Sequence, residues 1–211
     1  MIKVTLGNGE IKEFDAPLSA FDAARELGEA KTACAAEIDG KVCDLRTTLT
    51  DGCTVKFLTF EDEQGQRAFN HTASHVLAQA VKRLFPATKL AIGPAIENGF
   101  YYDFDTEEPF TTDTLAKIEA EMKKIVKENL ALKPFVLPRD EAIKFMQEKG
   151  EPYKVELIED LPEGETISFY QQGDFVDLCA GPHILYTKGI KAFKLTSIAG
   201  AYWRGSEKNK M

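Results

Sequence analysis

His71-Thr72-Ala73-Ser74-His75 is the first of two short runs that carry the main information on the fold and the candidate site of this chain. The second run, Cys179-Ala180-Gly181-Pro182-His183, follows about a hundred residues later. The two runs hold all three histidines of the chain and one of its four cysteines. From the first run onward, apolar residues recur with the spacing of one helical face: Ala73, Val76, Leu77, Ala80, Val81 and Leu84. We therefore expect a helix from residue 71 to residue 84, with both histidines of the first run one turn apart on the face opposite this apolar stripe.

The second run is expected on a turn or at the end of a strand, because Pro182 disfavours a helical conformation at Gly181. The residues before it, Ile167 to Tyr170 and Phe175 to Cys179, have the alternation of a hairpin with a turn at Gln172-Gly173-Asp174. Alternation also places Asp177 on the same side of its strand as the cysteine. The sequence thus predicts that this carboxylate joins the histidines.

A histidine pair on a helix that faces a Cys-His pair on a loop has two chemical interpretations. His71, His75, Cys179 and His183 are a complete tetrahedral zinc set, and closure by four protein ligands would make that site structural. The same groups without a metal could orient water and donate to an ester in a hydrolytic cleft. Two histidines on the polar face of an arbitrary helix are more often simply solvated, and it is the second run that favours a site. Spacing alone does not decide between zinc and hydrolysis.

Composition and charge narrow the function classes. At 211 residues, with 44% apolar and 28% charged side chains, the chain is expected to form two globular domains. It has no apolar run of about eighteen residues and no signal peptide, so we expect a cytoplasmic protein without a membrane partner and with free thiols. The net charge of −8 argues against a free-standing nucleic-acid binder, but it allows a domain that receives only one nucleotide end.

The first sixty residues predict a ubiquitin-like β-grasp domain. Two alternating strands flank Gly7-Asn8-Gly9, a short helix follows the capping sequence Ser19 to Asp22 and ends before Gly28, and three short strands complete the unit. The polar run 60–67, FEDEQGQR, is the expected boundary, and we divide the chain into domains 1–62 and 63–211. The fold class is α+β.

The larger domain is expected to be α/β-mixed, with an antiparallel sheet and the HxxxH helix. Helices are predicted for Asp113–Leu130 and Asp140–Glu148, whereas Tyr153–Leu161 fits either a helix or a strand. An aromatic strand is predicted for residues 100–105, with Phe100, Tyr102 and Phe104 on one face, and residues 190–195 also alternate. The charged tail 206–211 ends without a stop signal, so we expect a chain that is cut there rather than finished.

Four runs in this order resemble the amino-terminal half of bacterial-type threonyl-tRNA synthetases: HTASHVLAQAV (71–81), IGPAIENGFYYDFD (92–105), FYQQGDFVDLCAGPHI (169–184) and KLTSIAGAYWRG (194–205). The resemblance covers essentially the whole chain. It implies a TGS domain in residues 1–62 and an editing domain in residues 63–211. The family's aminoacylation and anticodon-binding domains would follow residue 211 and are the implied partners, so this chain should not activate threonine.

The resemblance implies post-transfer editing. A site that accepts threonine cannot strongly exclude serine, because one missing methyl group is worth only about 1–3 kcal/mol of discrimination. A second pocket that admits serine but not threonine can hydrolyse the mischarged ester, which is double-sieve editing. The implied substrate is the 3′ end of tRNA(Thr) carrying serine.

The resemblance also implies roles for the clustered residues. His71 and His75 would bind or polarise the terminal ribose and the ester, and either could orient a water. Asp177 would hold the substrate ammonium group or an imidazole. Cys179 and His183 would line the serine pocket. Cysteine as a covalent nucleophile is disfavoured, because so labile an ester does not require an acyl-enzyme.

Other implied site residues lie outside the cluster. Lys154 would stabilise the oxyanion or hold water, unless it is a surface lysine. Tyr102 would stack near the adenosine, unless it packs in the core. Gly181 and Pro182 would line the substrate, together with Ala180, which replaces an arginine often found in the family and so puts a phosphate contact from this loop in doubt.

Two readings of the cofactor requirement follow from the resemblance. Related editing domains of alanyl type use this ligand pattern with zinc, whereas the threonyl family implies a metal-free, water-mediated site. We therefore expect no cofactor. The alternative is a zinc-stabilised module, held by His71, His75, Cys179 and His183, that docks tRNA or the synthetase body without chemistry.

Overall fold

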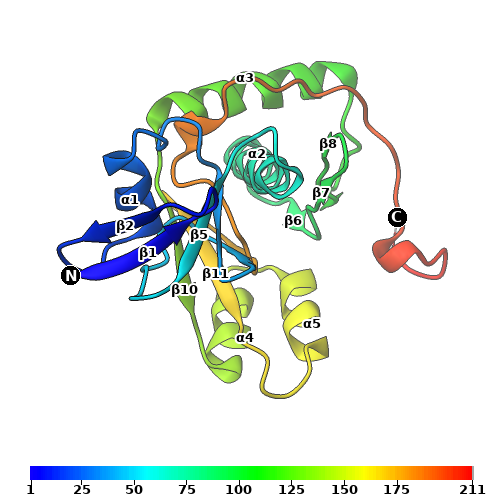
Figure 1. The fold of residues 1–211 in the computed structure, drawn as a ribbon. Helices are drawn as coiled ribbons and strands as arrows, with labels where there is room; N and C mark the ends of the chain where they lie inside the picture. The colour runs from blue at the N-terminus through cyan, green and yellow to red at the C-terminus, as the bar shows by residue number, and fades with distance from the viewer. Residues whose placement is uncertain (211) are drawn as a thin grey trace.

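In the computed structural model, which describes residues 1–210, the amino-terminal unit is a mixed sheet of five strands with one helix across it (Figure 1). The strand order is β2-β1-β5-β3-β4, with β1 parallel to β5 and the other neighbours antiparallel. This order confirms the predicted β-grasp fold. Its elements are β1 (Ile2–Leu6), β2 (Ile11–Phe14), α1 (Ala20–Glu26), β3 (Ala35–Ile38), β4 (Lys41–Cys43) and β5 (Thr54–Leu58).

The start of helix α1 follows directly from its sequence. The Ser19 hydroxyl accepts a hydrogen bond from the Asp22 backbone N–H at 3.1 Å and donates one to the Asp22 carboxylate at 2.7 Å. Such a cap satisfies one of the N–H groups that the first helical turn leaves without a partner. Gly28 lies just beyond the helix at a φ of +81°, which a glycine adopts without strain. The predicted capping sequence is therefore confirmed.

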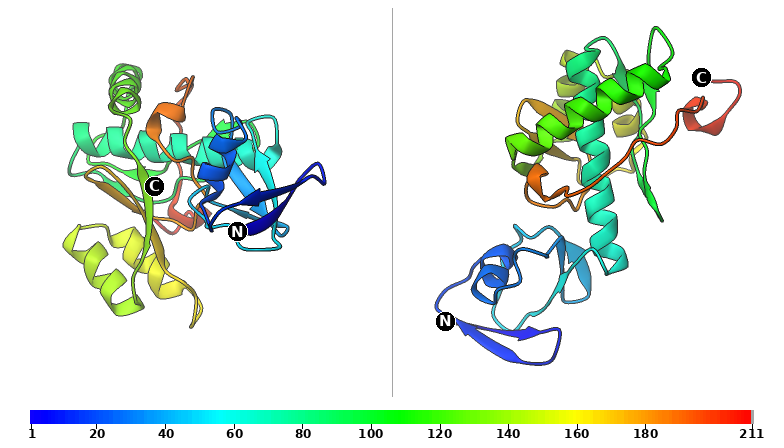
Figure 2. Two further views of the ribbon diagram at one scale, coloured as in Figure 1. Left: turned by 60° about the vertical axis from the view of Figure 1, so that its left-hand side comes forward. Right: turned by 90° about the horizontal axis from the view of Figure 1, so that it is seen from above.

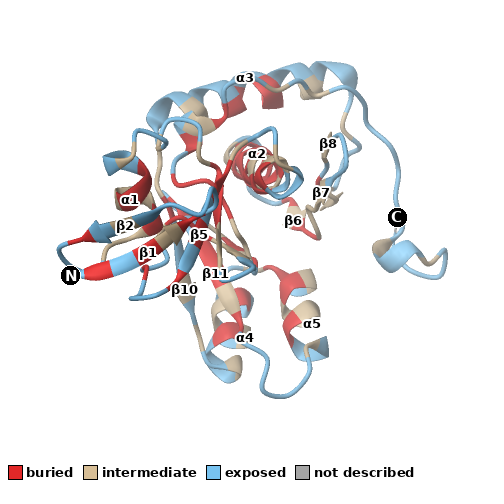
Figure 3. Cartoon of the chain, viewed as in Figure 1, coloured by how far each residue is buried: buried red, intermediate tan, exposed pale blue. Residues whose placement is uncertain are grey.

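A long helix, α2 (Glu63–Leu84, 22 residues), runs from the β-grasp sheet through the centre of the second unit (Figure 2). It begins eight residues before the predicted start at His71, so most of the polar run 60–67 is helical rather than a loop. The side predicted to lie opposite the apolar stripe is also buried, because the second unit surrounds the helix (Figure 3). His75 and Ala78 on that side are 2% and 0% exposed.

The second unit combines helices with small antiparallel sheets, as predicted. Helix α3 packs on α2, and the three-stranded sheet has the order β10-β11-β12. Helices α4 and α5 pack together and bury Phe169 of β11. The bounds are α3 (Thr112–Glu128), β10 (Leu132–Val136), α4 (Arg139–Glu148), α5 (Pro152–Asp160), β11 (Ser168–Gln172) and β12 (Phe175–Leu178). Two-residue strands form two further pairs: β6 (Lys89–Leu90) with β9 (Phe104–Asp105), and β7 (Ala95–Ile96) with β8 (Gly99–Phe100).

Two sequence predictions change in this unit, and a third segment that was left open is assigned. The aromatic segment 100–105 is not one strand, because its two ends pair with different partners in β8 and β9. Residues 190–195 form no strand; instead the Leu195 backbone N–H donates to Glu119 of α3 at 3.1 Å. The ambiguous segment 153–161 is helix α5, which has Pro152 in its first turn, where a missing N–H costs nothing.

Each unit contributes one buried residue to the hydrophobic core of the other. Leu185, from the second unit, is 6% exposed and packs in the core of the β-grasp sheet. Cys34, from the β-grasp unit, is 7% exposed and packs in the core around α2. The predicted division at residue 62 falls at the N-cap of α2 and stays a prediction. Within residues 1–210, none of the helices is both long and apolar enough to cross a membrane.

Candidate functional site

The four residues of the predicted cluster converge. Helix α2 presents His71 and His75 one turn apart, and strand β12 ends one residue before Cys179. The ring of His183 lies 4.2 Å from the rings of both other histidines, measured between centroids. One donor atom from each of the four residues falls within 4.8 Å of the others.

The loop that joins Cys179 to His183 depends on its glycine. Gly181 has a φ of +70° and is followed by a cis peptide bond to Pro182. A Cβ atom at Gly181 would lie only 2.4 Å from the Tyr170 hydroxyl oxygen, so a larger residue has neither the backbone freedom nor the space. The Gly181 backbone N–H donates to the Cys179 sulfur at 3.2 Å, and this bond folds the loop back on the thiol.

Thr72, which the sequence analysis did not single out, fixes the protonation of His183. Its hydroxyl donates to the Ala68 carbonyl at 2.8 Å, so it can only accept from its other two neighbours. Those neighbours are the Ile184 backbone N–H at 3.1 Å and Nδ1 of His183 at 3.0 Å. His183 therefore carries its hydrogen on Nδ1 and turns the lone pair of Nε2 toward the Cys179 sulfur, 3.1 Å away.

Cys179 is a neutral thiol in this environment. Burial is the largest influence on its sulfur and raises the pKa to about 12. The thiol can donate to the free lone pair on His183 Nε2, and Nε2 of His71 lies 3.3 Å from the same sulfur. A thiol held so far from its thiolate form is a poor nucleophile, which agrees with the expectation that Cys179 does not form a covalent intermediate.

Beside the cluster lies a buried polar network of Tyr102, Lys154 and Asp177. Nζ of Lys154 is 2.7 Å from Oδ1 of Asp177 and 2.9 Å from the Tyr102 hydroxyl, which donates to Oδ2 of Asp177 at 2.6 Å. Lys154 is 3% exposed, so the alternative of a surface lysine is wrong. Tyr102 is 7% exposed and takes part in the network from the core. Asp177 joins the cluster as alternation predicted, with Oδ2 at 3.8 Å from Nε2 of His75.

Burial holds all three histidines in the neutral form at neutral pH. It lowers the pKa of His71 to about 4 and that of His75 to about 3, against the smaller opposing effect of the Asp177 charge. It also lowers the pKa of His183 well below its usual value, and the other two histidines add to this effect. For Asp177, burial is the largest single influence and raises the pKa, but the Lys154 ammonium, His75 and the hydrogen bond from Tyr102 together lower it further, so the net pKa is lowered.

The cluster is less buried on one side. Ala180 is exposed, and His71, Gly181 and Pro182 are half-buried, whereas His75 and His183 are 2% and 0% exposed. The three predicted substrate-binding residues of the loop thus border the open side together with His71. This is the side on which the cluster is accessible from solvent.

The four donors also fit a zinc ion. Nδ1 of His75 is buried and has no hydrogen-bond partner among the described residues, so it is free to bind a ligand. The sulfur lies 3.1 and 3.3 Å from two imidazole nitrogens, close to the roughly 3.5 Å that separates sulfur from nitrogen around tetrahedral zinc. Thr72 orients His183 through its other ring nitrogen, as outer partners of metal-binding histidines do.

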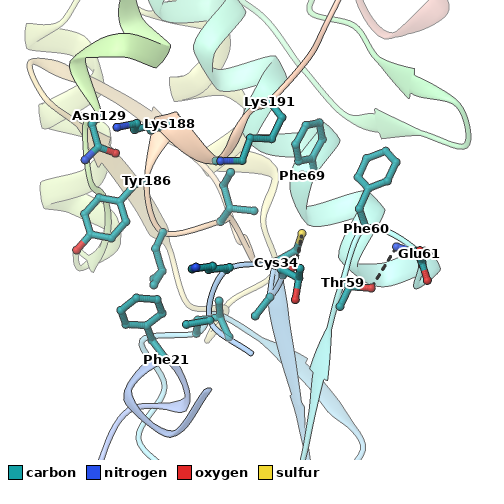
Figure 4. A pocket seen from close by; sticks show the side chains of 18 of the residues that line it. Phe21, Cys34, Thr59, Phe60, Glu61, Phe69, Asn129, Tyr186, Lys188 and Lys191 are labelled. Atoms are coloured by element: carbon teal, nitrogen blue, oxygen red, sulfur yellow. Dashed lines mark hydrogen bonds between the residues drawn. The ribbon is translucent and has the colours of Figure 1, made fainter. Parts of the chain in front are cut away.

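A cavity of about 820 Å³ lies elsewhere, between the β-grasp unit and the second unit (Figure 4). Phe69 of α2 lines it, and this residue faces away from His71 because two helical positions are about 200° apart. The β-grasp unit contributes Phe21 and Cys34, and the second unit contributes Tyr186 and Lys191. The cavity is therefore separate from the histidine cluster.

Comparison with known proteins matches both parts of the chain. Residues 2–59 match the family described as TGS domain, and residues 167–211 match the Threonyl and Alanyl tRNA synthetase second additional domain. The whole chain is similar to threonine–tRNA ligases of Acetivibrio thermocellus, Clostridium perfringens and Clostridium botulinum, with 63%, 62% and 60% identity over 213 aligned positions. The alignments cover 100% of this chain.

The chain belongs to the amino-terminal region of the threonine–tRNA ligase family. It spans 33–34% of the length of these ligases. The β-grasp unit is the TGS domain, as the resemblance implied, and the matched part of the second additional domain contains Asp177, Cys179 and His183. The α2 histidines lie outside that match, so the fold itself is what joins the two halves of the cluster.

Proposed function

We propose that this chain hydrolyses the ester of seryl-tRNA(Thr) with a positioned water, as the editing part of a threonine–tRNA ligase. The observation that carries the proposal is the convergence of His71, His75, Cys179 and His183 beside the buried Lys154–Asp177 pair. The similarity to ligases of that name supports the substrate class. Aminoacylation of threonine belongs to the remaining length of such ligases.

Serine is the amino acid that such a site must remove. A synthetic site shaped for threonine discriminates against serine by about 1–3 kcal/mol only, so some tRNA(Thr) is charged with serine. A pocket without space for the threonine methyl group admits the serine ester alone. We assign the walls of this pocket to Cys179 and His183, with Gly181 and Pro182 at its open side.

The reaction itself asks little of the protein, because an aminoacyl ester is already reactive. A water adds to the carbonyl carbon, the bond to the ribose oxygen breaks, and that oxygen takes up the proton that the water gives up. His71, at the open side, binds the ribose and the ester, and His75 offers its unpartnered Nδ1 to the attacking water. Both are unprotonated at neutral pH, so each can accept a hydrogen bond from that water and orient it.

The buried network supplies the charges. The Lys154 ammonium stabilises the negative charge that develops on the ester oxygen or holds the water in place. Asp177 keeps this ammonium fixed and attracts the substrate ammonium group or an imidazole. Tyr102 hydrogen-bonds to both and sets their positions, so we assign it to the network rather than to stacking on the adenosine.

A second candidate function rests on the fit of the four donors to zinc. His71, His75, Cys179 and His183 would hold the ion, which would supply structural closure by four protein ligands. The chain would then be a docking module for tRNA or the synthetase body. The proposed partners of either function are the 3′ end of tRNA(Thr) and the aminoacylation and anticodon-binding domains, in the cytoplasm.

The deciding experiment measures deacylation of seryl-tRNA(Thr) and threonyl-tRNA(Thr) by the purified chain, with and without a chelator. We expect rapid loss of serine only, unchanged by the chelator and lowered by on the order of 100-fold in His71→Ala. Gln64→Ala is the matched control, because Gln64 is exposed on the same helix and distant from the cluster. Background rates with one zinc per chain would overturn hydrolysis and support the docking module.

A further inference from the structure

The TGS domain reaches the candidate site through the loop that follows β4. The Arg46 guanidinium donates to two backbone carbonyls of the second unit, to Leu132 through Nε at 2.9 Å and to Leu185 through Nη2 at 3.1 Å. It also lies over the Tyr186 ring, 5.7 Å from the centroid. One TGS side chain therefore joins β10 to the segment that follows His183.

The same loop holds a buried tyrosine of the second unit. The Tyr170 hydroxyl donates to Oδ2 of Asp44 at 3.1 Å, and Oδ1 of Asp44 accepts from the Arg46 backbone N–H at 2.8 Å. Asp44 is 9% exposed and Tyr170 is 4% exposed. A hydrogen bond between buried groups is costly to break, because water cannot take the place of the missing partner.

Tyr170 touches the cluster directly. Its ring meets the His183 ring edge to face, with centroids 4.5 Å apart, and its hydroxyl lies against Gly181. It also packs with Cys179 in a small buried group, and on the sheet it pairs with Asp177 across β11 and β12. Any shift of this ring moves the walls of the proposed serine pocket.

The segment after the cluster is held by the TGS domain as well. Leu185, two residues beyond His183, lies in the TGS core, and its carbonyl accepts from Arg46. The neighbouring part of the interface is hollow, since the cavity of Figure 4 borders Leu45 and Leu185. Contacts of the loop 44–46 therefore align the two units at this point.

We propose that the TGS loop 44–46 positions the hydrolytic cluster, with Asp44 acting through Tyr170 on His183 and the Cys179 loop, and Arg46 acting through Leu185. This inference rests on the proposed editing function and assigns the TGS domain a part in it. Asp44, Arg46 and Tyr170 are positioning residues, because none of them reaches the reacting ester.

The test compares Asp44→Ala and Tyr170→Phe with the wild-type chain in steady-state deacylation of seryl-tRNA(Thr). Tyr170→Phe keeps the ring on His183 and removes only the bond to Asp44. We expect kcat to fall on the order of 10-fold in both variants with little change in KM, because the groups are misaligned rather than lost. Asp44→Asn should recover most of the rate, since its amide can donate to the Tyr170 oxygen.

A matched control is Asp51→Ala, which removes a carboxylate of the TGS domain that accepts the Lys3 backbone N–H at 2.8 Å. This variant should deacylate at the wild-type rate. Wild-type kcat in folded Asp44→Ala and Tyr170→Phe would overturn the positioning role, and so would an equal loss in Asp51→Ala.

A second readout separates this inference from the proposed function. Histidine ring nitrogen shifts, recorded by NMR on the labelled chain, report the position of His183 whether or not serine is released. We expect the His183 signals to move in Asp44→Ala and Tyr170→Phe and to stay in place in Asp51→Ala. Unmoved His183 signals overturn positioning, whereas a wild-type chain that does not deacylate overturns only the editing proposal.

Discussion

At the level of single residues, burial decides the chemistry of the cluster. Three imidazoles and a thiol share one interior, and none of them carries a charge at neutral pH. The charges lie beside them instead, in the Lys154–Asp177 pair, where each ion compensates the other and the Tyr102 hydroxyl hydrogen-bonds to both. A water placed between the neutral cluster and the Lys154–Asp177 pair would meet neutral acceptors on one side and a fixed cation on the other.

Neutral buried histidines make the folded state sensitive to mild acid. The unfolded chain takes up protons near pH 6.5, whereas folded His71 and His75 do so only near pH 4 and pH 3. Between these values the unfolded state binds more protons, so the free energy of unfolding falls as the pH is lowered, by about 1.4 kcal/mol per histidine per pH unit. Asp177 acts in the same direction but only below about pH 4, because its folded pKa is the lower one.

Urea denaturation at pH 7, 6 and 5 measures this effect. All three histidines of the chain lie in the cluster, so the histidine contribution to the slope between pH 6 and pH 5 comes from the site. The raised pKa values of the Asp44 and Asp103 carboxyls act in the opposite direction and are the same in the wild-type chain and in a histidine variant. We expect about one third less slope in His71→Gln, which removes one of the three protons taken up on unfolding. A flat profile in the wild-type chain, or an unchanged slope in the variant, would contradict the neutral buried histidines.

Spacing along the chain predicts the principal site residues because both periodicities are local. The helical period brings His71 and His75 together, and strand alternation adds Asp177 to Cys179. The same spacing does not identify Thr72 or Tyr170. Thr72 lies inside the run between the two histidines, and Tyr170 has the pattern of an ordinary aromatic residue in a strand. Their roles depend on partners more than a hundred residues away, and no local period carries that information.

At the level of elements, helix α2 shows why composition misplaced a boundary. Its first turns are largely polar and only partly buried, and they contain Gly65, so the sequence there has the character of a loop. Gly65 is nevertheless buried against the Thr59 backbone. A Cβ atom at this position would lie only 1.9 Å from the Thr59 carbonyl oxygen. The helix passes so close to the end of β5 that only a glycine fits.

Gly65→Ala tests this reading of α2. Helix propensity alone predicts a gain of about 1 kcal/mol, since alanine is the better helix former. We expect the opposite sign, a loss of about 1–3 kcal/mol, because the neighbouring atom is backbone and cannot turn aside as a side chain could. Chemical denaturation gives the free energy of unfolding, and Gln64→Ala, one position earlier and exposed, should leave it within about 0.5 kcal/mol. A stabilised Gly65→Ala chain would contradict the close approach.

At the level of the whole molecule, each of the two units contributes a residue to the core of the other. Leu185 completes the TGS core and Cys34 completes the core around α2, while α2 itself starts at the end of the TGS sheet. The β-grasp order was predictable because hairpin, cap and turn signals are local. The exchange of core residues was not, since Leu185 and Cys34 are apolar residues like any others until the fold brings them to the opposite core.

This exchange predicts how the molecule melts. Calorimetry of the wild-type chain should show a single thermal transition, because neither core is complete without a residue of the other unit. Leu185→Ala should cost about 2–5 kcal/mol and separate an earlier TGS transition from a later one, since it removes the side chain that ties the cores together. Leu6→Ala is the matched control: it empties a similar volume in the same core, at 8% against 6% exposure, but belongs to the TGS sheet itself. It should lower the transition temperature and leave one transition. Two transitions in the wild-type chain would show that the units unfold independently and would contradict this prediction. The TGS loop would then position the cluster through its own contacts alone, without cooperative folding of the two units.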